Sequence, residues 1–166
     1  MSGAGVAKEE GDDEGKVCGF RREVCSPVGG VFRSRMKLLV DTAALIWFLR
    51  KDEEISARAA GAIEDSRNQV YVSAAALWEI SAKAATGALV APEGLGETLS
   101  QDLEEAGFRI LAIEGRHAEE VSRLPRVHPD PFDRLMIAQC RCEKMTAVTN
   151  DVSWSDRRYE IATLWK

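Results

Sequence analysis

From residue 36 onward, short apolar runs alternate with longer stretches of helical pattern. The first run, MKLLVD at 36–41, predicts a buried strand that ends on an acid. Four later runs share its shortness and its apolar or β-branched character: 69–72, 109–113, 145–149 and 161–165. Helical patterns fill the intervals: 42–51, 57–65, 74–86, 97–106, 115–124 and 131 to about 144. Strands that alternate with helices indicate crossovers, and therefore an α/β fold around a short, mostly parallel sheet with helices on both faces.

Residues with capping preferences stand at the predicted helix ends. Ser56 and Ser73 each precede a helical stretch, where a hydroxyl can accept a hydrogen bond from a free backbone N–H. Asp130 followed by Pro131 has the form of an N-cap and a first helical residue. Gly87 stops the helical pattern that follows Ser73. These signals place helix boundaries independently of the apolar pattern.

Residues 1–35 differ from the rest of the chain. They contain seven glycines, six basic and six acidic residues, and no apolar periodicity. We therefore predict a flexible tail at 1–35 and one folded domain at 36–166, with Met36 as a possible start of the natural product. The tail has no apolar core of the kind that a secretory signal needs. No run in the chain approaches the roughly 20 apolar residues of a membrane helix, so we expect no membrane partner.

The net charge of −5 argues against a generally basic nucleic-acid-binding domain. Any contact with nucleic acid must then depend on a local basic patch or on metal ions. The four cysteines do not have zinc-site spacing and are too few for a disulfide scaffold in a chain of 166 residues. Reduced thiols and a cytoplasmic location are the expectation.

Acids stand at the predicted carboxyl ends of the strands, where ligands of α/β sheets bind. Asp41 ends the first strand, and Asp151 lies just beyond the strand at 145–149. Asp133 falls in the first turn of the helix before that strand, and Glu79 lies among apolar residues of the helix after Ser73. Such acids would suit Mg²⁺ or Mn²⁺, which take oxygen ligands.

Each acid also has a purely structural interpretation. Asp41 and Asp151 can be turn residues, and Glu79 can pair with Lys83 one helical turn away. Asp130 and Asp133 can both satisfy free N–H groups at a helix start, and for Asp130 we favour that role. We likewise interpret His128 as part of the loop structure.

Four segments together resemble the PIN domain, and in particular the VapC-type toxin ribonucleases of toxin–antitoxin pairs. The segments are MKLLVDTAALIWFL (36–49), VYVSAAALWEISAKAATGAL (70–89), HPDPFDRLMIAQC (128–140) and TAVTNDVSW (146–154). The resemblance implies a three-layer α/β/α sandwich and a metal-dependent endoribonuclease site. It implies four catalytic and metal-binding acids: Asp41, Glu79, Asp133 and Asp151. It also implies supporting residues around them: Thr42, Asp130, Arg134 and Thr149.

The resemblance further implies RNA as substrate, a small antitoxin as partner, and a homodimer or a toxin–antitoxin hetero-oligomer. Arg134, Lys83 and Arg126 are candidate phosphate contacts, and Asn150 stands where the family commonly has an arginine. The apolar run at 45–48 is either a dimer interface or a helix buried on several sides.

Two other functions remain as alternatives. A phosphoacceptor receiver domain also gathers acids at strand ends, but the chain has neither adjacent acids at the end of its first strand nor a lysine after its last long one. A PIN-like binding module without catalysis would have the same fold, and the complete set of acids argues against it.

Overall fold

The computed structural model describes residues 35–90 and 98–166, so the predicted tail at 1–35 falls almost wholly outside the described residues. Five parallel strands form one sheet in the order β3-β2-β1-β4-β5. Its strands are β1 (Lys37–Val40), β2 (Gln69–Ser73), β3 (Arg109–Leu111), β4 (Thr146–Val148) and β5 (Ala162–Leu164). The helices are α1 (Thr42–Arg50), α2 (Ala57–Glu64), α3 (Ala74–Ala85), α4 (Leu99–Glu105), α5 (Gly115–Arg123) and α6 (Pro131–Glu143).

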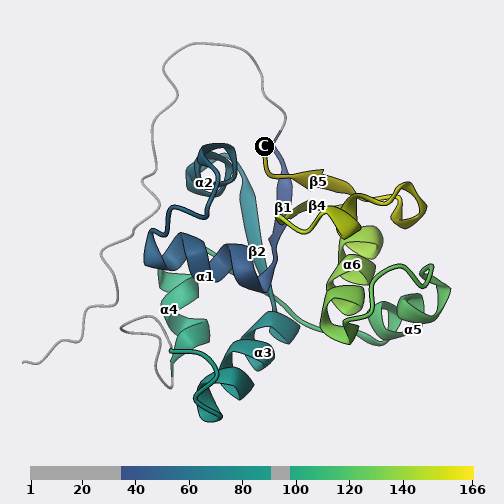
Figure 1. Ribbon diagram of the computed structural model, residues 1–166. Coiled ribbons are helices and arrows are strands. Elements are labelled where there is room, and N and C mark those ends of the chain that lie inside the picture. The colour runs from purple at the N-terminus through teal and green to yellow at the C-terminus, as the bar shows by residue number, and fades with distance from the viewer. Residues whose placement is uncertain (1–34, 91–97) are drawn as a thin grey trace, which may run out of the picture.

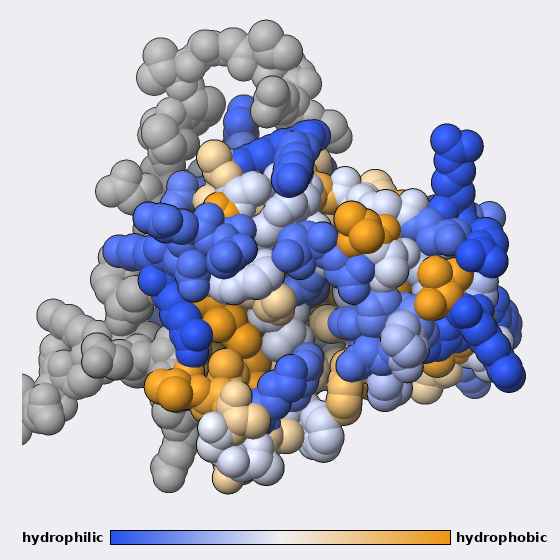
Figure 2. All heavy atoms as spheres, viewed as in Figure 1, coloured by the Kyte–Doolittle hydropathy of each residue, from blue (hydrophilic) through white to orange (hydrophobic). Residues whose placement is uncertain are grey.

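The helices form two layers around this sheet. Figure 1 shows α1, α2 and α4 on one side of the strands and α5 and α6 on the other, with α3 below the ends of β1 and β2. Helix α3 contacts both α1 and α6 and so closes the end of the sandwich. The predicted α/β/α sandwich around a parallel sheet is confirmed. In the same orientation, Figure 2 shows hydrophilic residues over most of the visible face and a smaller apolar area at the lower left.

The core lies on both faces of β1 and β4. Leu38, Leu39 and Val40 of β1 are fully buried, as are Ala147 and Val148 of β4. A central parallel strand is covered by helices on both faces, which is why its residues form a continuous apolar run instead of an alternating one.

The predicted caps are in place. Ser56 accepts a hydrogen bond from the N–H of Ala59, and Ser73 accepts one from Ala75. Gly87 has φ +71°, a conformation that glycine adopts without the steric penalty of a side chain. Local hydrogen bonding therefore sets these helix ends, as the sequence predicts.

The connection from β4 to β5 was not predicted. It contains two short 3₁₀ helices, η1 (Val152–Ser155) and η2 (Arg157–Tyr159). Trp154 and Tyr159 are buried, at 1% and 0% exposure, and fill the space that a crossover helix would otherwise cover. Elements of three or four residues are too short to show a helical apolar period, so the sequence pattern does not reveal them.

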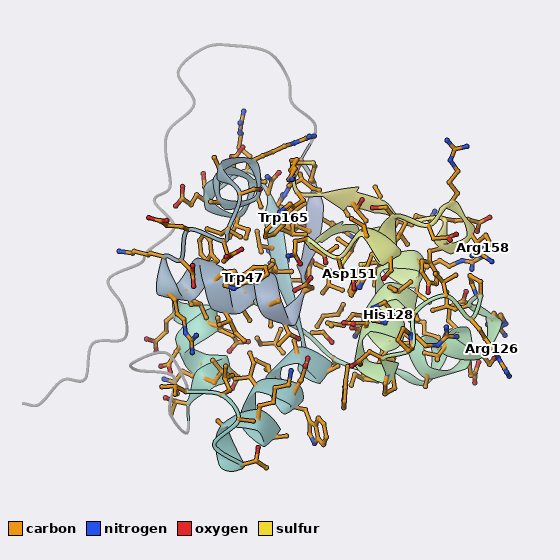
Figure 3. All side chains as sticks on the ribbon, in the orientation of Figure 1. Trp47, Arg126, His128, Asp151, Arg158 and Trp165 are labelled. Atoms are coloured by element: carbon orange, nitrogen blue, oxygen red, sulfur yellow. The ribbon has the colours of Figure 1, made fainter. Side chains whose placement is uncertain are left out.

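The apolar run at 45–48 is covered within the monomer. Leu45 and Phe48 are buried in the core, and Trp47 packs against Trp165 with ring centroids 5.9 Å apart (Figure 3). Phe48 also meets Phe108 edge to face at 6.0 Å. Of the two interpretations of this run, packing on several sides is the one that these contacts support.

No helix among residues 35–90 and 98–166 has the length and apolar character needed to cross a membrane. In the same residues Cys140 and Cys142 are free thiols, and Cys140 is buried.

Candidate metal centre

The four predicted acids line one cleft at the carboxyl ends of β1 and β4. The cleft has a volume of about 330 Å³. Its ionisable lining consists of five carboxylates and one ammonium group, from Asp41, Glu79, Asp130, Asp133, Asp151 and Lys83. Residues from α1, α3, α6 and the β4–β5 connection therefore meet at one place.

Asp41 is the most deeply buried acid of the cleft, at 6% exposure. Its carboxylate caps α1 by accepting the N–H of Ala44 at 2.9 Å, and it also accepts the hydroxyl of Thr149. Its own N–H donates to the carbonyl of Val148 on β4 at 3.1 Å. Burial raises the pKa of Asp41, and these hydrogen bonds only partly oppose that effect. The residue is both a helix cap and a buried, disfavoured charge.

Glu79 reaches the cleft from the middle of α3. One carboxylate oxygen accepts the hydroxyl of Thr42 at 2.7 Å, and the other accepts Lys83 Nζ at 2.5 Å. The predicted pairing with Lys83 therefore exists, and it lies at the site. Just outside the cleft, Trp78 stacks on Phe132 with centroids 4.8 Å apart, which ties α3 to the start of α6.

Asp130 and Asp133 occupy the first turn of α6. Asp130 caps the helix through the N–H of Phe132 at 2.8 Å, as predicted. The pKa of Asp133 is raised to about 6: burial is the largest cause, His128 opposes it, and the nearby charges of Asp130, Asp41 and Glu79 add to it. Asp133, like Asp41, is thus an acid whose charge a cation would stabilise.

Asp151 and Thr149 connect the end of β4 to the cleft. The N–H of Asp151 donates to Thr149 Oγ1 at 3.0 Å, and the Asp151 carboxylate caps η1 by accepting the N–H of Ser153 at 2.7 Å. Burial acts to raise the pKa of Asp151, but the hydrogen bonds from Ser153 and His128 outweigh it, so the pKa is lowered. Thr149 thereby links Asp41 to Asp151.

His128 belongs to this cluster, although its sequence context indicated loop structure. Its Nε2 lies 2.9 Å from Asp151 Oδ2 and 3.2 Å from Asp133 Oδ2. Figure 3 shows His128 and Asp151 together between the strand ends and α6. The signal in the sequence was weak: His128 comes two residues before the Asp130 cap, and that position places the ring beside the first turn of α6.

Two of the three candidate phosphate contacts lie elsewhere. Both terminal nitrogens of Arg134 donate to backbone carbonyls, those of Pro125, Val121 and Leu124, so this guanidinium holds the loop before α6. Arg126 lies at the outer side of α5, away from Asp151 (Figure 3). Neither arginine lines the cleft with the acids, and both line a neighbouring hollow together with His128. Lys83 lines the cleft.

The donor set fits a hard divalent cation. All four predicted acids supply oxygen atoms, and Mg²⁺ and Mn²⁺ prefer oxygen ligands. Burial raises the pKa values of Asp41 and Asp133, and the charges of neighbouring carboxylates add to this effect, so a cation in the cleft would favour their ionised forms. Asp41, Glu79, Asp133 and Asp151 are the residues that would hold such an ion.

A sequence model of the family described as PIN domain matches residues 38–158, well over half of the chain. The match includes all four acids. No curated protein matches the chain.

Solved structures share the fold at low sequence identity. VapBC-1 from nontypeable Haemophilus influenzae has a TM-score of 0.59 at 13% identity, over 78% of this chain and 97% of that chain. FitAcB from Neisseria gonorrhoeae has a TM-score of 0.54 at 22% identity, over 76% and 96%. VapBC2 from Rickettsia felis, bound to a DNA fragment from its promoter, has a TM-score of 0.54 at 12% identity, over 79% and 100%. These likenesses concern the fold.

Proposed function

The chain belongs to the PIN-domain family, and on that premise we propose that it is a metal-dependent endoribonuclease, the toxin of a type II toxin–antitoxin pair. The observation that carries the proposal is the charge imbalance of the cleft, in which five carboxylates face one ammonium group. Such an arrangement lowers stability unless a cation completes it, and residues that lower stability are commonly kept for function.

A bound Mg²⁺ or Mn²⁺ supplies a water of lowered pKa and offsets the charge that develops on a phosphodiester. The protein's own residues prepare the site for this ion. Thr42 orients the Glu79 carboxylate and Thr149 the Asp41 carboxylate, while Ser153 and His128 contact the Asp151 carboxylate, each through a hydrogen bond. These contacts fix the carboxylates before the ion arrives, which reduces the reorganisation that binding requires.

Lys83 is the cationic side chain placed to meet a substrate phosphate. Its Nζ pairs with Glu79 at the rim, and about half of its side chain is exposed. Glu79 would hold the ion together with the other acids, and Lys83 would then be available to a phosphate oxygen. The proposal therefore assigns Lys83 to RNA binding and the acids to the metal.

An antitoxin is the proposed protein partner. A cleft with this charge offers a site for a basic side chain from a partner protein, which would compete with the cation. Solved structures of similar fold are described as VapBC2, FitAcB and VapBC-1, and the VapC-type toxins that the sequence resembles act with an antitoxin, which supports this choice. A homodimer or a toxin–antitoxin hetero-oligomer in the cytoplasm completes the proposal.

Cleavage of end-labelled single-stranded RNA by the purified full chain tests the function. We expect cleavage in Mg²⁺ or Mn²⁺, none in EDTA, and loss of cleavage in Asp41→Asn purified in the same way. Glu143→Gln, an acid at the far end of α6, is the matched control and should cleave like the wild type. Equal cleavage by the wild type and Asp41→Asn would reveal a contaminating nuclease. No cleavage of any RNA in either metal would favour the binding module without catalysis.

A further inference from the structure

Hydrogen bonds hold both the backbone and the ring of His128 in place. The backbone N–H of His128 donates to the hydroxyl of the buried Tyr159 at 2.8 Å. Its Nδ1 accepts the backbone N–H of Asp130 at 3.1 Å, and the side chain is only 8% exposed. Since Asp130 also caps α6, the ring is locked to the start of that helix.

The Asp130 contact decides which nitrogen carries the proton. A backbone N–H can only donate, so Nδ1 must accept with its lone pair and carries no hydrogen. The proton of the neutral ring is therefore on Nε2, the nitrogen that faces Asp151 and Asp133. One ligand atom from each of these three residues lies within 4.8 Å of the others, a spacing that would suit a metal ion. Nε2 nevertheless carries the proton of the ring, so it has no lone pair with which to bind a metal ion.

A histidine that binds metal has the opposite arrangement. Its second ring nitrogen donates its N–H to a carboxylate, carbonyl or water, which leaves the ligating nitrogen unprotonated. In His128 the second nitrogen accepts a hydrogen bond instead. The ring is thus a hydrogen-bond donor to the Asp151 carboxylate, which comes from the connection after β4, and it lies 3.2 Å from the Asp133 carboxylate of α6.

We infer that His128 is a positioning residue: its Nε2–H holds the Asp151 carboxylate beside that of Asp133, so that both present their remaining oxygens to one divalent cation. This inference rests on the proposed metal-dependent function. Without this donor, the like charges of Asp151 and Asp133 repel each other, and no ring contact keeps the Asp151 carboxylate turned toward Asp133. Loss of the donor should weaken metal binding about 10–100-fold, as removal of such outer contacts does elsewhere.

Two substitutions separate the ring's two hydrogen bonds. In His128→Asn, the side-chain oxygen sits where Nδ1 was and can still accept the Asp130 N–H, but nothing replaces the Nε2 donor. In His128→Gln, the amide nitrogen reaches the Nε2 position and can still donate to Asp151. We expect Mn²⁺ affinity, measured by electron paramagnetic resonance on the full chain, to fall about 10–100-fold in His128→Asn and less in His128→Gln.

His117 supplies a matched control. Its ring also has Nδ1 accepting a backbone N–H, from Glu114 at 3.0 Å, and Nε2 beside a carboxylate, Glu143 at 3.1 Å. His117→Asn should therefore change stability without changing Mn²⁺ affinity. Equal affinity of His128→Asn and the wild type would overturn the inference, whereas a wild type that binds no Mn²⁺ would instead count against the proposed function.

Nitrogen NMR of the wild type tests the same point without relying on a folded variant. The chain has two histidines, so long-range ¹H–¹⁵N spectra contain two imidazoles. Both should be Nε2–H tautomers, and Mg²⁺ should shift the His128 resonances while leaving His117 unmoved. An Nδ1–H tautomer at His128 in Mg²⁺ would identify the ring as a metal ligand and would contradict the inference that it is a positioning residue.

Discussion

Two buried histidines lie near opposite ends of α6 and are held in the same way. His128 precedes the helix, and His117 contacts Glu143 at its last residue. In each ring Nδ1 accepts a nearby backbone N–H and Nε2 faces a carboxylate. The local chemistry is shared, so the difference between the two regions must come from what surrounds them.

The surroundings differ in charge. Near His117, Glu143 also pairs with Arg116 at 2.5 Å, and Glu120 pairs with both Arg123 and Arg141. Near His128, the described residues that line the cleft include five carboxylates and one cationic side chain, Lys83. The helix dipole accentuates this arrangement, because the N-terminus of α6 favours acids whereas Glu143 at its C-terminus needs cations. The uncompensated negative charge, and not the buried histidine, therefore distinguishes the end of α6 that lies at the candidate metal centre.

The largest expected difference is in catalysis. Asp41→Asn and Glu79→Gln should each reduce RNA cleavage more than about 100-fold, since each removes a carboxylate from the metal site. Glu143→Gln should leave cleavage within about twofold of the wild type. Initial rates on one labelled RNA at saturating Mg²⁺ measure both. Comparable losses at the two ends of α6 would abolish the distinction drawn between them.

The next effect is on the pH dependence of metal binding. The pKa of Asp133 is raised to about 6, and the acid must lose its proton before it can bind a cation. Mn²⁺ affinity should therefore fall by about tenfold per pH unit below pH 6, and the Asp133→Asn variant should lose most of this dependence. Calorimetric titration between pH 5 and pH 7.5 measures it. A flat profile in the wild type would contradict the raised pKa.

The same pKa predicts how pH changes stability without metal. Burial favours the protonated form of Asp133, so between pH 3.8 and about 6 the folded state binds more protons than the unfolded state. The contribution of Asp133 to the free energy of unfolding should thus decrease as pH rises through this window. In EDTA, the difference in stability between the wild type and Asp133→Asn should accordingly move in favour of the variant as pH rises.

A smaller effect is expected on thermal stability. Burial disfavours the charge of Asp41, and asparagine can still cap α1, so Asp41→Asn should melt at the same or a higher temperature than the wild type in EDTA. Mg²⁺ at about ten times Kd should stabilise the wild type by roughly 1.4 kcal/mol, or about 3–5 °C in Tm. Calorimetric scans with and without Mg²⁺ check this. A loss of Tm in Asp41→Asn that is equal in both conditions would make Asp41 a cap only.

The smallest effect is expected at the compensated end. Glu143→Gln removes the charge that Arg116 and His117 share, and should destabilise by about 1 kcal/mol, or about 2–4 °C. Because no metal binds there, the loss should be the same in EDTA and in Mg²⁺. A Mg²⁺-dependent change in this variant would show that the two ends of α6 are coupled.

The sequence by itself determined the elements and the acids. The β1 run, the caps Ser56, Ser73 and Asp130, and the acids that follow the strands are all local features. Local hydrogen bonds and apolar periodicity act between neighbours in the chain, so neighbours reveal them. Because parallel strands all end at one edge, predicting the sheet was enough to bring Asp41 and Asp151 together.

Only the tertiary structure decided which further side chains join the acids. His128 meets Asp151 across 23 positions of sequence, and Thr42 meets Glu79 across 37. Arg134 stands one residue after Asp133, but its guanidinium donates to backbone carbonyls of α5 and the following loop. The raised pKa of Asp133 likewise depends on burial and on charges from other elements. Such contacts depend on how α1, α3 and α6 pack against one another, which no local pattern encodes.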